Sequence, residues 1–362
     1  MDGIGPVTVS VTNWNGAAFI EPCLDAVAAL RGEIAEVLVV DNASTDDSVA
    51  RIEAHASARG GRPLRLLRME RNDGPCPARN RALAEARTRW VLQLDSDVLV
   101  RPDTLERLAV ETRHPGVAAV QPRAVLAGDP GTIHYDGGRM HYVGMLCLDH
   151  FMTRAPDGVE PPADVDAVIS MALLLDRQAV LEAGGYDEAF FILFEDHDLS
   201  YRLRARGLRL RRVPAAIVLH REGTAGLSFR PGAPRYPPRR AFLHARNRSY
   251  LVLKNYSWPA LVATLPGRCL YGLLYLAFTL RRGVFVSWLR GRLDFLRLAP
   301  RALRLRRELA GRRVHGDGAL LVADDLSISP VIARSRLEAR VEKTFNALLR
   351  GWWRLARWFL TR

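Results

Sequence analysis

Two acidic clusters in the chain have the residue types and spacing of groups that bind a cation or move a proton. Asp95 and Asp97 end the apolar run in LQLDSDVLV, and Glu195, Asp196 and Asp198 follow FFILF. Paired carboxylates suit a hard divalent cation, which in turn can bridge phosphate oxygens. Carboxylates directly after an apolar stretch are costly to place there unless they have a use. The alternative is that Glu195, Asp196 and Asp198 are acidic residues favoured in the first turn of a helix.

Other polar residues follow apolar runs at the points where strands are expected to end. They are Asn13 and Asn15, Asp41 and Asn42, and Arg71 and Asn72. Ligands of open parallel sheets bind at the carboxyl ends of the strands. We therefore expect these side chains to share one site with the Asp95 cluster.

The elements that must position these residues alternate along the chain. Strands are predicted at 7–12, 37–40, 64–67, 91–94 and 117–121, and helices at 17–30, 46–59, 76–88 and 102–113. Continuous apolar strands between amphipathic helices predict an α/β fold with a parallel sheet covered on both faces. Farther on, a buried strand is predicted at 168–175 and a helix at 195–206. The two-residue strand period would point Asp95 and Asp97 to the same side.

The sequence contains neither of the glycine-rich phosphate-binding motifs, Gly-x-Gly-x-x-Gly and Gly-x(4)-Gly-Lys-Ser/Thr. If the sheet binds a nucleotide, another group must neutralise the phosphates. A divalent cation at Asp95 and Asp97 would do so.

The composition is that of a globular protein in a reducing compartment. Of the 362 residues, 48% are hydrophobic and 25% are charged, which excludes a wholly disordered or collagen-like chain. The cysteines Cys23, Cys76, Cys147 and Cys269 form no Cys-x-x-Cys pair, so we expect no disulfide framework and no zinc knuckle. The first residues, MDGIGPVTVSV, do not have the pattern of a signal peptide. A cytoplasmic location is therefore expected.

The net charge of +13 is concentrated near the end of the chain. Residues 281–313 contain eleven arginines and two acidic residues, and residues 334–362 contain eight basic and two acidic residues. Such a region favours a polyanion: acidic lipid, nucleic acid or an acidic partner. The apolar stretches 256–267 and 269–280 are both too short to cross a bilayer.

At helical spacing, apolar residues near the C-terminus share one face while arginines lie off it. The apolar residues are Phe345, Leu348, Leu349, Trp352, Ala356 and Phe359, and the arginines are Arg350, Arg354 and Arg357. This pattern is typical of a helix that lies on an anionic membrane surface. The alternative is a helix packed on the body with a solvated arginine face. Nucleic-acid binding is disfavoured, because no nucleic-acid-binding motif accompanies the charge.

Six segments in order resemble a family 2 glycosyltransferase with the GT-A fold, of the rhamnosyltransferase-like kind. They are VSVTNWNG, VVDNASTDDS, RNDGPCPARN, LDSD, GGYDEAFFILFEDHDLSYR and the later LH. The resemblance implies a Rossmann-like mixed sheet with helices on both faces over 1–250. The nucleotide-binding half would cover about 1–120 and the acceptor half 121–250, with a helical, arginine-rich, membrane-associating region at 251–362.

The resemblance also implies roles for residues on the donor side. Asp41 would bind the pyrimidine base, with Asn13 and Asp46 in the same pocket. Arg79 or Asn80 would approach the ribose, the phosphates or the sugar.

The remaining implied roles concern the cation and the proton. Asp97 would bind Mn²⁺ or Mg²⁺ directly, with Asp95 beside it and His220 as the third metal-side residue; an imidazole ligand favours Mn²⁺. Asp196 would be the catalytic base, and Glu195 is the second choice. Three further histidines, His134, His141 and His150, are expected to be loop residues without chemistry.

These roles imply a metal-dependent, inverting transfer of one hexose, with rhamnose as one candidate, from a UDP- or dTDP-sugar. The acceptor would be a lipid-linked or cell-surface glycan at the inner face of the cell membrane. The Gln-x-x-Arg-Trp motif of processive synthases is absent, which favours addition of one sugar or a few.

Two alternative functions remain. One is a sugar-phosphate nucleotidylyltransferase, although no Gly-rich signature with Arg and Lys follows the first strand. The other is a non-catalytic basic scaffold on the membrane surface, against which the intact carboxylates argue.

Overall fold

The computed structural model describes residues 4–58, 63–158, 160–221, 227, 235–326 and 336–360, without the side chains of 336–339. The chain forms two compact units. The first contains Met1–Gly137, Asp149–Leu203 and Leu208–Glu222, and the second contains Gly138–Leu148, Arg204–Gly207 and Gly223–Arg362.

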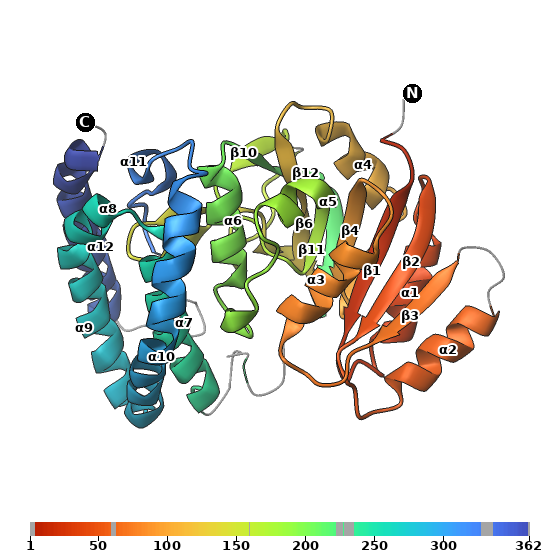
Figure 1. Ribbon diagram of the computed structural model, residues 1–362, viewed down its shortest axis with the longest axis horizontal. Helices are drawn as coiled ribbons and strands as arrows, with labels where there is room; N and C mark the ends of the chain where they lie inside the picture. Colours follow the sequence, from red (N-terminus) through yellow and green to blue (C-terminus); the bar gives the residue numbers. More distant parts are fainter. Residues whose placement is uncertain are drawn as a thin grey trace. The chain divides into compact units, whose positions relative to one another are not determined.

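A ten-stranded mixed sheet forms the centre of the first unit (Figure 1). Its main path runs in the order β10-β12-β6-β11-β4-β1-β2-β3, while β5 pairs with β12 and β7 with β6. The strands are β1 (Val7–Asn13), β2 (Ile34–Asp41), β3 (Leu64–Arg68), β4 (Trp90–Asp95), β5 (Val98–Val100), β6 (Val117–Leu126), β7 (Asp129–Tyr135), β10 (Ala163–Val165), β11 (Ala172–Asp176) and β12 (Arg209–His220). As expected, β1 to β4 run parallel to one another.

Helices pack on both faces of this sheet. They are α1 (Ile20–Ala28), α2 (Ser48–Ala58), α3 (Pro75–Glu85), α4 (Thr104–Glu111), α5 (Arg177–Glu182) and α6 (Glu195–Ala205), with a short 3₁₀ turn at Glu188–Phe190. On one face, apolar residues of β1, β2 and β4 form a single core with those of α1, α2 and α4. On the other face, residues of β2, β4 and β11 pack against α3, α5 and α6. The predicted two-sided cover is confirmed, and the carboxyl ends of β1, β2 and β4 are left at one edge.

Two details of the predicted sheet were wrong. The strand β11 lies between β4 and β6 and is antiparallel to both, so the sheet is not parallel throughout as the alternating pattern predicted. In addition, β4 ends at Asp95, and Asp97 lies in the turn that leads to β5. The two-residue strand period therefore does not apply from Asp95 to Asp97. The turn, and not strand alternation, sets the directions of these two side chains.

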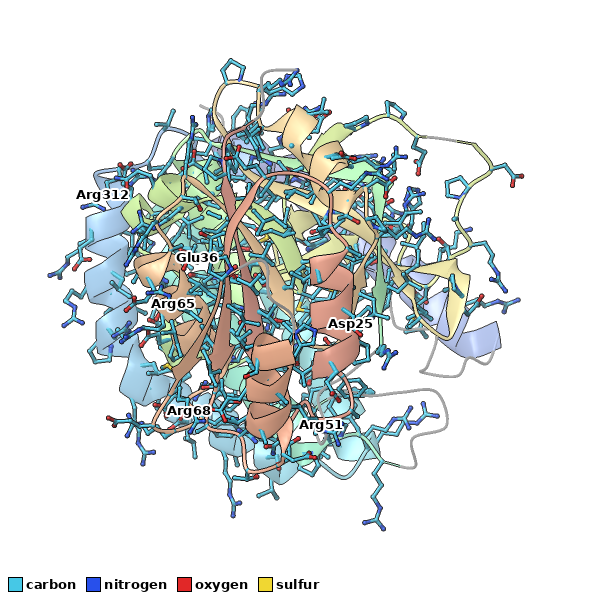
Figure 2. The ribbon with its side chains drawn as sticks, turned by 90° about the vertical axis from the view of Figure 1, so that its right-hand side faces the viewer. Asp25, Glu36, Arg51, Arg65, Arg68 and Arg312 are labelled. Atoms are coloured by element: carbon cyan, nitrogen blue, oxygen red, sulfur yellow. The ribbon has the colours of Figure 1, made fainter. Side chains whose placement is uncertain are left out.

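The edge of the sheet at β3 carries charged side chains in ion pairs (Figure 2). Arg65 of β3 lies 3.3 Å from Glu36 of β2, and Arg51 of α2 lies 2.7 Å from Glu21 of α1. Charges along an edge strand oppose pairing with another chain. These charges therefore protect the exposed edge of the sheet.

The second unit is mainly helical. Its elements are β8 (Gly138–His141), β9 (Met145–Leu148), α7 (Pro238–Asn255), α8 (Trp258–Ala263), α9 (Leu265–Arg281), α10 (Phe285–Ala310), α11 (Asp317–Leu320) and α12 (Arg336–Leu360). Gly291 of α10 lets that helix approach α7 closely, because a Cβ there would lie 2.2 Å from the Phe242 carbonyl oxygen. Within the described ranges, none of the helices has the length and hydropathy needed to cross a bilayer.

Helix α12 has two apolar stripes instead of the single apolar face expected. One stripe is buried in the second unit and consists of Phe345, Leu349, Trp353 and Ala356. Tyr142 anchors it by stacking on Trp353 and donating a hydrogen bond to the Leu349 carbonyl. The other stripe is exposed and consists of Leu348, Trp352, Leu355 and Phe359. The helix is therefore packed within the second unit and still presents an apolar surface.

Candidate active site

The first part of the site is a buried polar cluster where β1 and β2 end side by side. Asn13 is paired in register with Asp41 and donates from Nδ2 to its Oδ1 at 2.8 Å. Ser44 donates to the same carboxylate through its backbone N–H (3.0 Å) and its hydroxyl (2.6 Å). Both Asn13 and Asp41 are almost fully buried. The expected donor-side residues therefore lie together and orient one another.

Asp46 joins this cluster through Ser48. The Ser48 hydroxyl donates to Asp46, and it accepts a 3.0 Å hydrogen bond from Asn13 Nδ2. Asp46 also accepts from the backbone N–H of Ala17 at 2.9 Å. Burial acts to raise the pKa of Asp46, but these hydrogen bonds outweigh it and lower the pKa below its ordinary value. Asp46 therefore holds the loop after β1 as a carboxylate.

Arg79 links the strand end at Asp95 to the second acidic cluster. Its Nη2 donates to both oxygens of Asp95, at 2.9 and 3.1 Å, and its Nη1 lies 3.5 Å from Glu195 Oε1. The guanidinium is buried, while the Asp95 side chain remains 29% exposed. Burial acts to lower the pKa of Arg79, but the neighbouring carboxylates outweigh it and raise the pKa well above its ordinary value. One fixed positive charge thus joins the two clusters.

Asp97 pairs with His220 across the turn between β4 and β5. His220 Nε2 lies 3.2 Å from Asp97 Oδ2, and β12 places His220 opposite Val98. The Asp97 side chain is 21% exposed, so a ligand can reach it. Burial acts to raise the pKa of Asp97, but the His220 hydrogen bond outweighs it and lowers the pKa below its ordinary value. An ionised carboxylate and an imidazole nitrogen therefore face each other at an accessible position.

His134 extends this pair. It lies in β7 rather than in a loop, and its Nδ1 is 2.7 Å from Nδ1 of His220. The two imidazole rings stack with centroids 4.8 Å apart. Burial and the neighbouring His220 lower the pKa of His134 to about 3, so its ring is neutral at neutral pH.

The three acids of α6 have different surroundings. Glu195 is buried beside Arg79, and its Oε2 has no hydrogen-bond partner among the described residues. Asp196 accepts a 3.0 Å hydrogen bond from the backbone N–H of Ser170. Asp198 is fully buried in an ion pair with Arg202 at 2.7 Å. Asp198 is therefore a structural residue, whereas Glu195 and Asp196 lie near the chemistry-bearing groups.

The ionisation of the first two acids is shifted toward the protonated form. Burial, together with the charge of Asp196, raises the pKa of Glu195 to about 8. Burial also raises the pKa of Asp196, although Arg79 and the Ser170 hydrogen bonds oppose the shift. A carboxylate with a raised pKa near the operating pH is suited to accept a proton.

The loop before α6 is held in a strained conformation. Phe191, Leu193 and Phe194 all have positive φ angles, which non-glycine residues rarely adopt. Gly74, with φ +94°, permits this loop to approach, because a Cβ at Gly74 would lie 2.2 Å from the Phe191 carbonyl oxygen. The glycine of RNDGPCPARN thus sets the position of the loop that leads into Glu195 and Asp196.

Asn80 lies apart from the groups around Asp95. Its amide donates to the Tyr186 carbonyl at 2.8 Å and to Glu188 at 2.9 Å, and it accepts from the Tyr186 N–H at 2.8 Å. Arg79 or Asn80 was expected to approach the nucleotide sugar. Arg79 lies beside Asp95, whereas Asn80 fixes the turn after Gly185.

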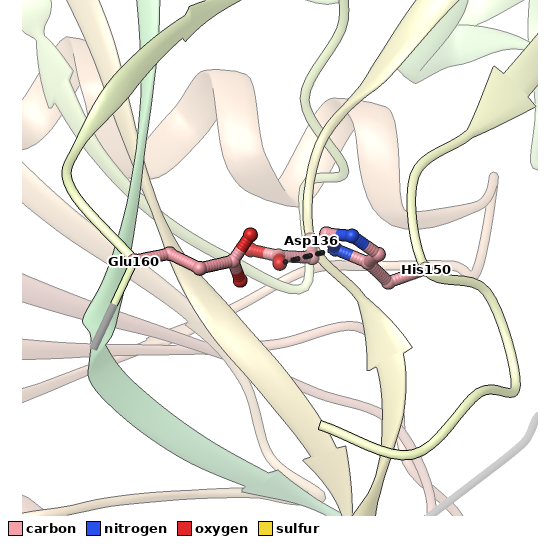
Figure 3. A group of neighbouring side chains, drawn as sticks. All are labelled: Asp136, His150 and Glu160. Carbon is pink, nitrogen blue, oxygen red and sulfur yellow. Dashed lines mark hydrogen bonds and ion pairs between the residues drawn. The ribbon is translucent and has the colours of Figure 1, made fainter. Parts of the chain in front are cut away.

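A second group of potential ligands lies in the first unit, formed by Asp136, His150 and Glu160 (Figure 3). Their ligand atoms lie within 4.8 Å of one another. However, Asp136 already accepts from Arg123 at 2.6 Å and from Arg212 at 3.0 Å, and Arg123 also pairs with Glu160. Two guanidinium groups neutralise the two carboxylates, so a divalent cation would have to displace them. At Asp97, by contrast, the carboxylate lies 3.2 Å from an imidazole nitrogen, that of His220.

Sequence reasoning missed three side chains at the site. Ser44 and Ser48 occur within VVDNASTDDS, so their hydroxyls could have been assigned to the donor cluster from the motif. His134 had no such signal, because its partner His220 follows 86 residues later in the chain.

Comparisons with known proteins agree with this arrangement. The model of glycosyl transferase family 2 matches residues 8–161, and that of glycosyl transferase family group 2 matches residues 90–290, more than half of the chain. The pre-mycofactocin glycosyltransferase of Mycobacterium tuberculosis is 32% identical over 248 residues, covering 65% of this chain and 49% of its own length. The succinoglycan biosynthesis protein ExoO of Rhizobium meliloti is 39% identical over 108 residues, 30% of each chain. The chain thus spans about half the length of the first of these curated relatives.

A solved structure supports the fold. The crystal structure of GalNAc-T7 with UDP, GalNAc and Mn²⁺ covers 73% of this chain and 51% of its own, with a TM-score of 0.56 and 16% identity. The expected GT-A fold, a mixed sheet with helices on both faces and further helices at the C-terminus, is confirmed. Rhamnosyltransferase-like specificity stays a prediction. The chain belongs to the family 2 glycosyltransferases.

Proposed function

We propose that this protein transfers a single hexose from a UDP- or dTDP-sugar to a lipid-linked or cell-surface glycan, with inversion at the anomeric carbon. The observation that carries the proposal is the link that Arg79 makes between Asp95, at a strand end, and Glu195, the neighbour of Asp196. A glycosyl transfer needs a group that takes up charge on the departing diphosphate beside a group that takes the acceptor proton. The Arg79 link supports the proposal, because it joins the acids of α6 to the strand end that the proposed cation ligand Asp97 follows.

On the donor side, the buried Asn13–Asp41 cluster is assigned to the nucleotide base. One of its features supports this role: Oδ1 of Asn13 is buried without a hydrogen-bond partner among the described residues. Asp95, which is partly exposed, is assigned to the ribose, and the fixed positive charge of the buried Arg79 behind it would offset part of the diphosphate charge. A pyrimidine nucleotide would thus extend from Asp41 toward Asp95.

A divalent cation fits the Asp97–His220 pair. One carboxylate oxygen and one imidazole nitrogen form the kind of mixed donor set that Mn²⁺ accepts, and Mg²⁺ is the alternative. A GT-A structure with UDP and Mn²⁺ is among the solved structures that resemble this chain. When bound, the cation would stabilise negative charge on the leaving diphosphate. The protein's own part is to hold Asp97 ionised and His220 oriented toward it.

Asp196 is assigned as the general base that removes the acceptor hydroxyl proton. Its raised pKa favours proton uptake, and the Ser170 N–H holds one of its oxygens in place. Glu195 remains the second choice, but it is almost fully buried against Arg79. The proposal assigns one general base and no nucleophilic residue to the site. The reaction is therefore a single displacement, which inverts the anomeric carbon.

We further propose that the second unit holds the enzyme at an anionic membrane surface. Of the eighteen large apolar side chains that are exposed in the described part of the chain, sixteen lie between Trp258 and Phe359. Those on α12 include Leu355 (62% exposed) and Phe359 (67%), in a helix that also carries exposed Arg354. Apolar side chains beside arginines suit the interface of an acidic bilayer. An acceptor anchored in lipid would be reached from such a position at the inner face of the cell membrane.

The donor is tested by thermal shift with a panel of nucleotide sugars, with and without Mn²⁺, followed by a transfer assay. A ligand that binds only the folded state raises the melting temperature with its concentration. We expect a UDP- or dTDP-hexose, with dTDP-rhamnose in the panel, to stabilise the protein more in the presence of Mn²⁺. Stabilisation by purine nucleotide sugars alone would contradict the assignment of Asp41.

A further inference from the structure

The histidine pair at the cation site contains a residue that none of the assigned roles uses. His134 and His220 approach through their Nδ1 atoms at 2.7 Å, a distance at which a hydrogen bond joins them. A neutral imidazole carries a proton on one ring nitrogen and a lone pair on the other. In this contact one Nδ1 therefore donates and the other accepts, so the tautomers of the two rings depend on each other.

The other nitrogen of His220 faces Asp97. Without a cation, the 3.2 Å contact requires a proton on His220 Nε2, which donates to the carboxylate. In a neutral His220, Nδ1 is then the acceptor, and His134 Nδ1 is the donor. For His220 to bind a cation through Nε2, that nitrogen must present its lone pair, and its proton must then be on Nδ1. His220 Nδ1 then donates, and the lone pair of His134 Nδ1 accepts.

We infer that His134 is a positioning residue for the cation: it accepts the Nδ1 proton of His220 and so fixes the tautomer in which His220 Nε2 can bind a divalent metal. The inference rests on the proposed function, because it assumes that Asp97 and His220 hold the cation. Histidine ligands commonly donate their second N–H to a neighbouring acceptor, which fixes ring orientation and raises ligand basicity. Here the acceptor is another imidazole.

The surroundings of His134 keep its ring in place for this role. Its ring stacks on that of His220 and lies against Tyr135 and Phe151, with centroids 4.1 and 6.2 Å away. It comes from β7, which pairs with β6, and β6 pairs with β12, the strand that ends at His220. The two histidines are therefore positioned by one continuous piece of sheet.

The test measures Mn²⁺ affinity in the presence of UDP by calorimetry, for the full chain and four variants. His134→Phe keeps an aromatic ring in the stack but cannot accept a hydrogen bond. His134→Asn places an amide oxygen near the Nδ1 position, whereas the amide of His134→Gln lies one bond farther out. His220→Ala removes the proposed ligand. Loss of an outer partner of a ligand typically costs about 10- to 100-fold in metal affinity.

We expect His134→Phe and His134→Gln to weaken Mn²⁺ binding to this degree, and His134→Asn to restore most of it. The melting temperatures without metal should differ little between the Asn and Gln variants, since both introduce a primary amide. If His220→Ala weakens Mn²⁺ binding but the Phe and Gln variants bind like the wild type, the inference is overturned and the cation site stands. Equal losses in the Asn and Gln variants also overturn it. Unchanged binding in His220→Ala overturns the cation site as well.

Discussion

Arg79 donates from a single nitrogen to both oxygens of Asp95, at 2.9 and 3.1 Å. The pairing of a buried guanidinium with this carboxylate lets Asp95 and Asp97 lie close together without two uncompensated negative charges. It also separates their roles, because Asp95 is occupied by Arg79 while Asp97 faces His220. The same guanidinium reaches Glu195, so one side chain joins the strand end at Asp95 to the acids of α6.

Asp196→Asn should separate chemistry from donor binding. The amide can still accept the Ser170 N–H but cannot take a proton, so turnover should fall by about 10²- to 10⁴-fold while UDP affinity changes little. Steady-state kinetics and calorimetry measure the two quantities. Near-normal turnover would move the base to another residue.

Asp198→Asn is the comparison variant on the same helix. Removing the charge from this buried ion pair leaves Arg202 uncompensated, which typically costs about 3–5 kcal/mol of stability. Its main effect should be a lower melting temperature, with turnover per folded molecule retained.

Glu195→Gln should change how stability depends on pH. The folded protein holds the Glu195 proton up to a pKa of about 8, whereas the unfolded chain releases it near 4.5. Between these values the folded state binds more protons than the unfolded state, so this group makes the wild type less stable as pH rises. Glutamine has no such proton. The melting temperature of the variant minus that of the wild type should therefore increase from about pH 5 to about pH 8. Plots of melting temperature against pH that run parallel for the two proteins would show that the pKa of Glu195 is not raised.

Gly74→Ala should disturb the loop that precedes α6. The new Cβ would lie 2.2 Å from the Phe191 carbonyl oxygen at a φ of +94°, so both the contact and the backbone conformation oppose it. We expect a loss of more than about 1 kcal/mol in the free energy of unfolding, together with reduced turnover. Gly128→Ala is the control, because a Cβ there meets nothing within 4 Å. Equal melting temperatures for the two variants would contradict the proposed close approach.

The exposed stripe of α12 is tested by flotation with vesicles of phosphatidylcholine and phosphatidylglycerol. Leu355→Glu combined with Phe359→Glu should release the protein from these vesicles, because both side chains are exposed and the new charges oppose burial in an anionic interface. Val110→Glu on α4 is a matched control, since Val110 is 53% exposed in the first unit. If the double variant floats with the vesicles as well as the wild type does, the exposed stripe of α12 does not bind the membrane surface.

Local sequence patterns predicted the parallel part of the sheet and its helices. Apolar runs and amphipathic spacing act over neighbouring residues, and for this reason β1 to β4 and α1 to α4 were found with errors only at their ends. The insertion of β11 between β4 and β6 was not predictable in this way, because it depends on pairing between segments far apart in the chain.

The same distinction applies to the site. Asp41, Asp97 and Asp196 could be recognised as candidate site residues from the sequence, because each is a carboxylate that follows an apolar run. The partners of these side chains could not be predicted from the sequence. Asp95 pairs with Arg79, and His220 with His134, because separate elements pack together in the fold. The expectation that strand alternation would align Asp95 with Asp97 failed because the strand ends between them.

The most direct test of the account compares UDP binding with and without Mn²⁺ in the wild type and in Asp97→Ala. The account predicts that Mn²⁺ strengthens UDP binding to the wild type, and that the variant loses this increase while it keeps the metal-free affinity supplied by the Asn13–Asp41 cluster. An Mn²⁺-dependent increase of the same size in Asp97→Ala would contradict the assignment of the cation to this edge of the sheet.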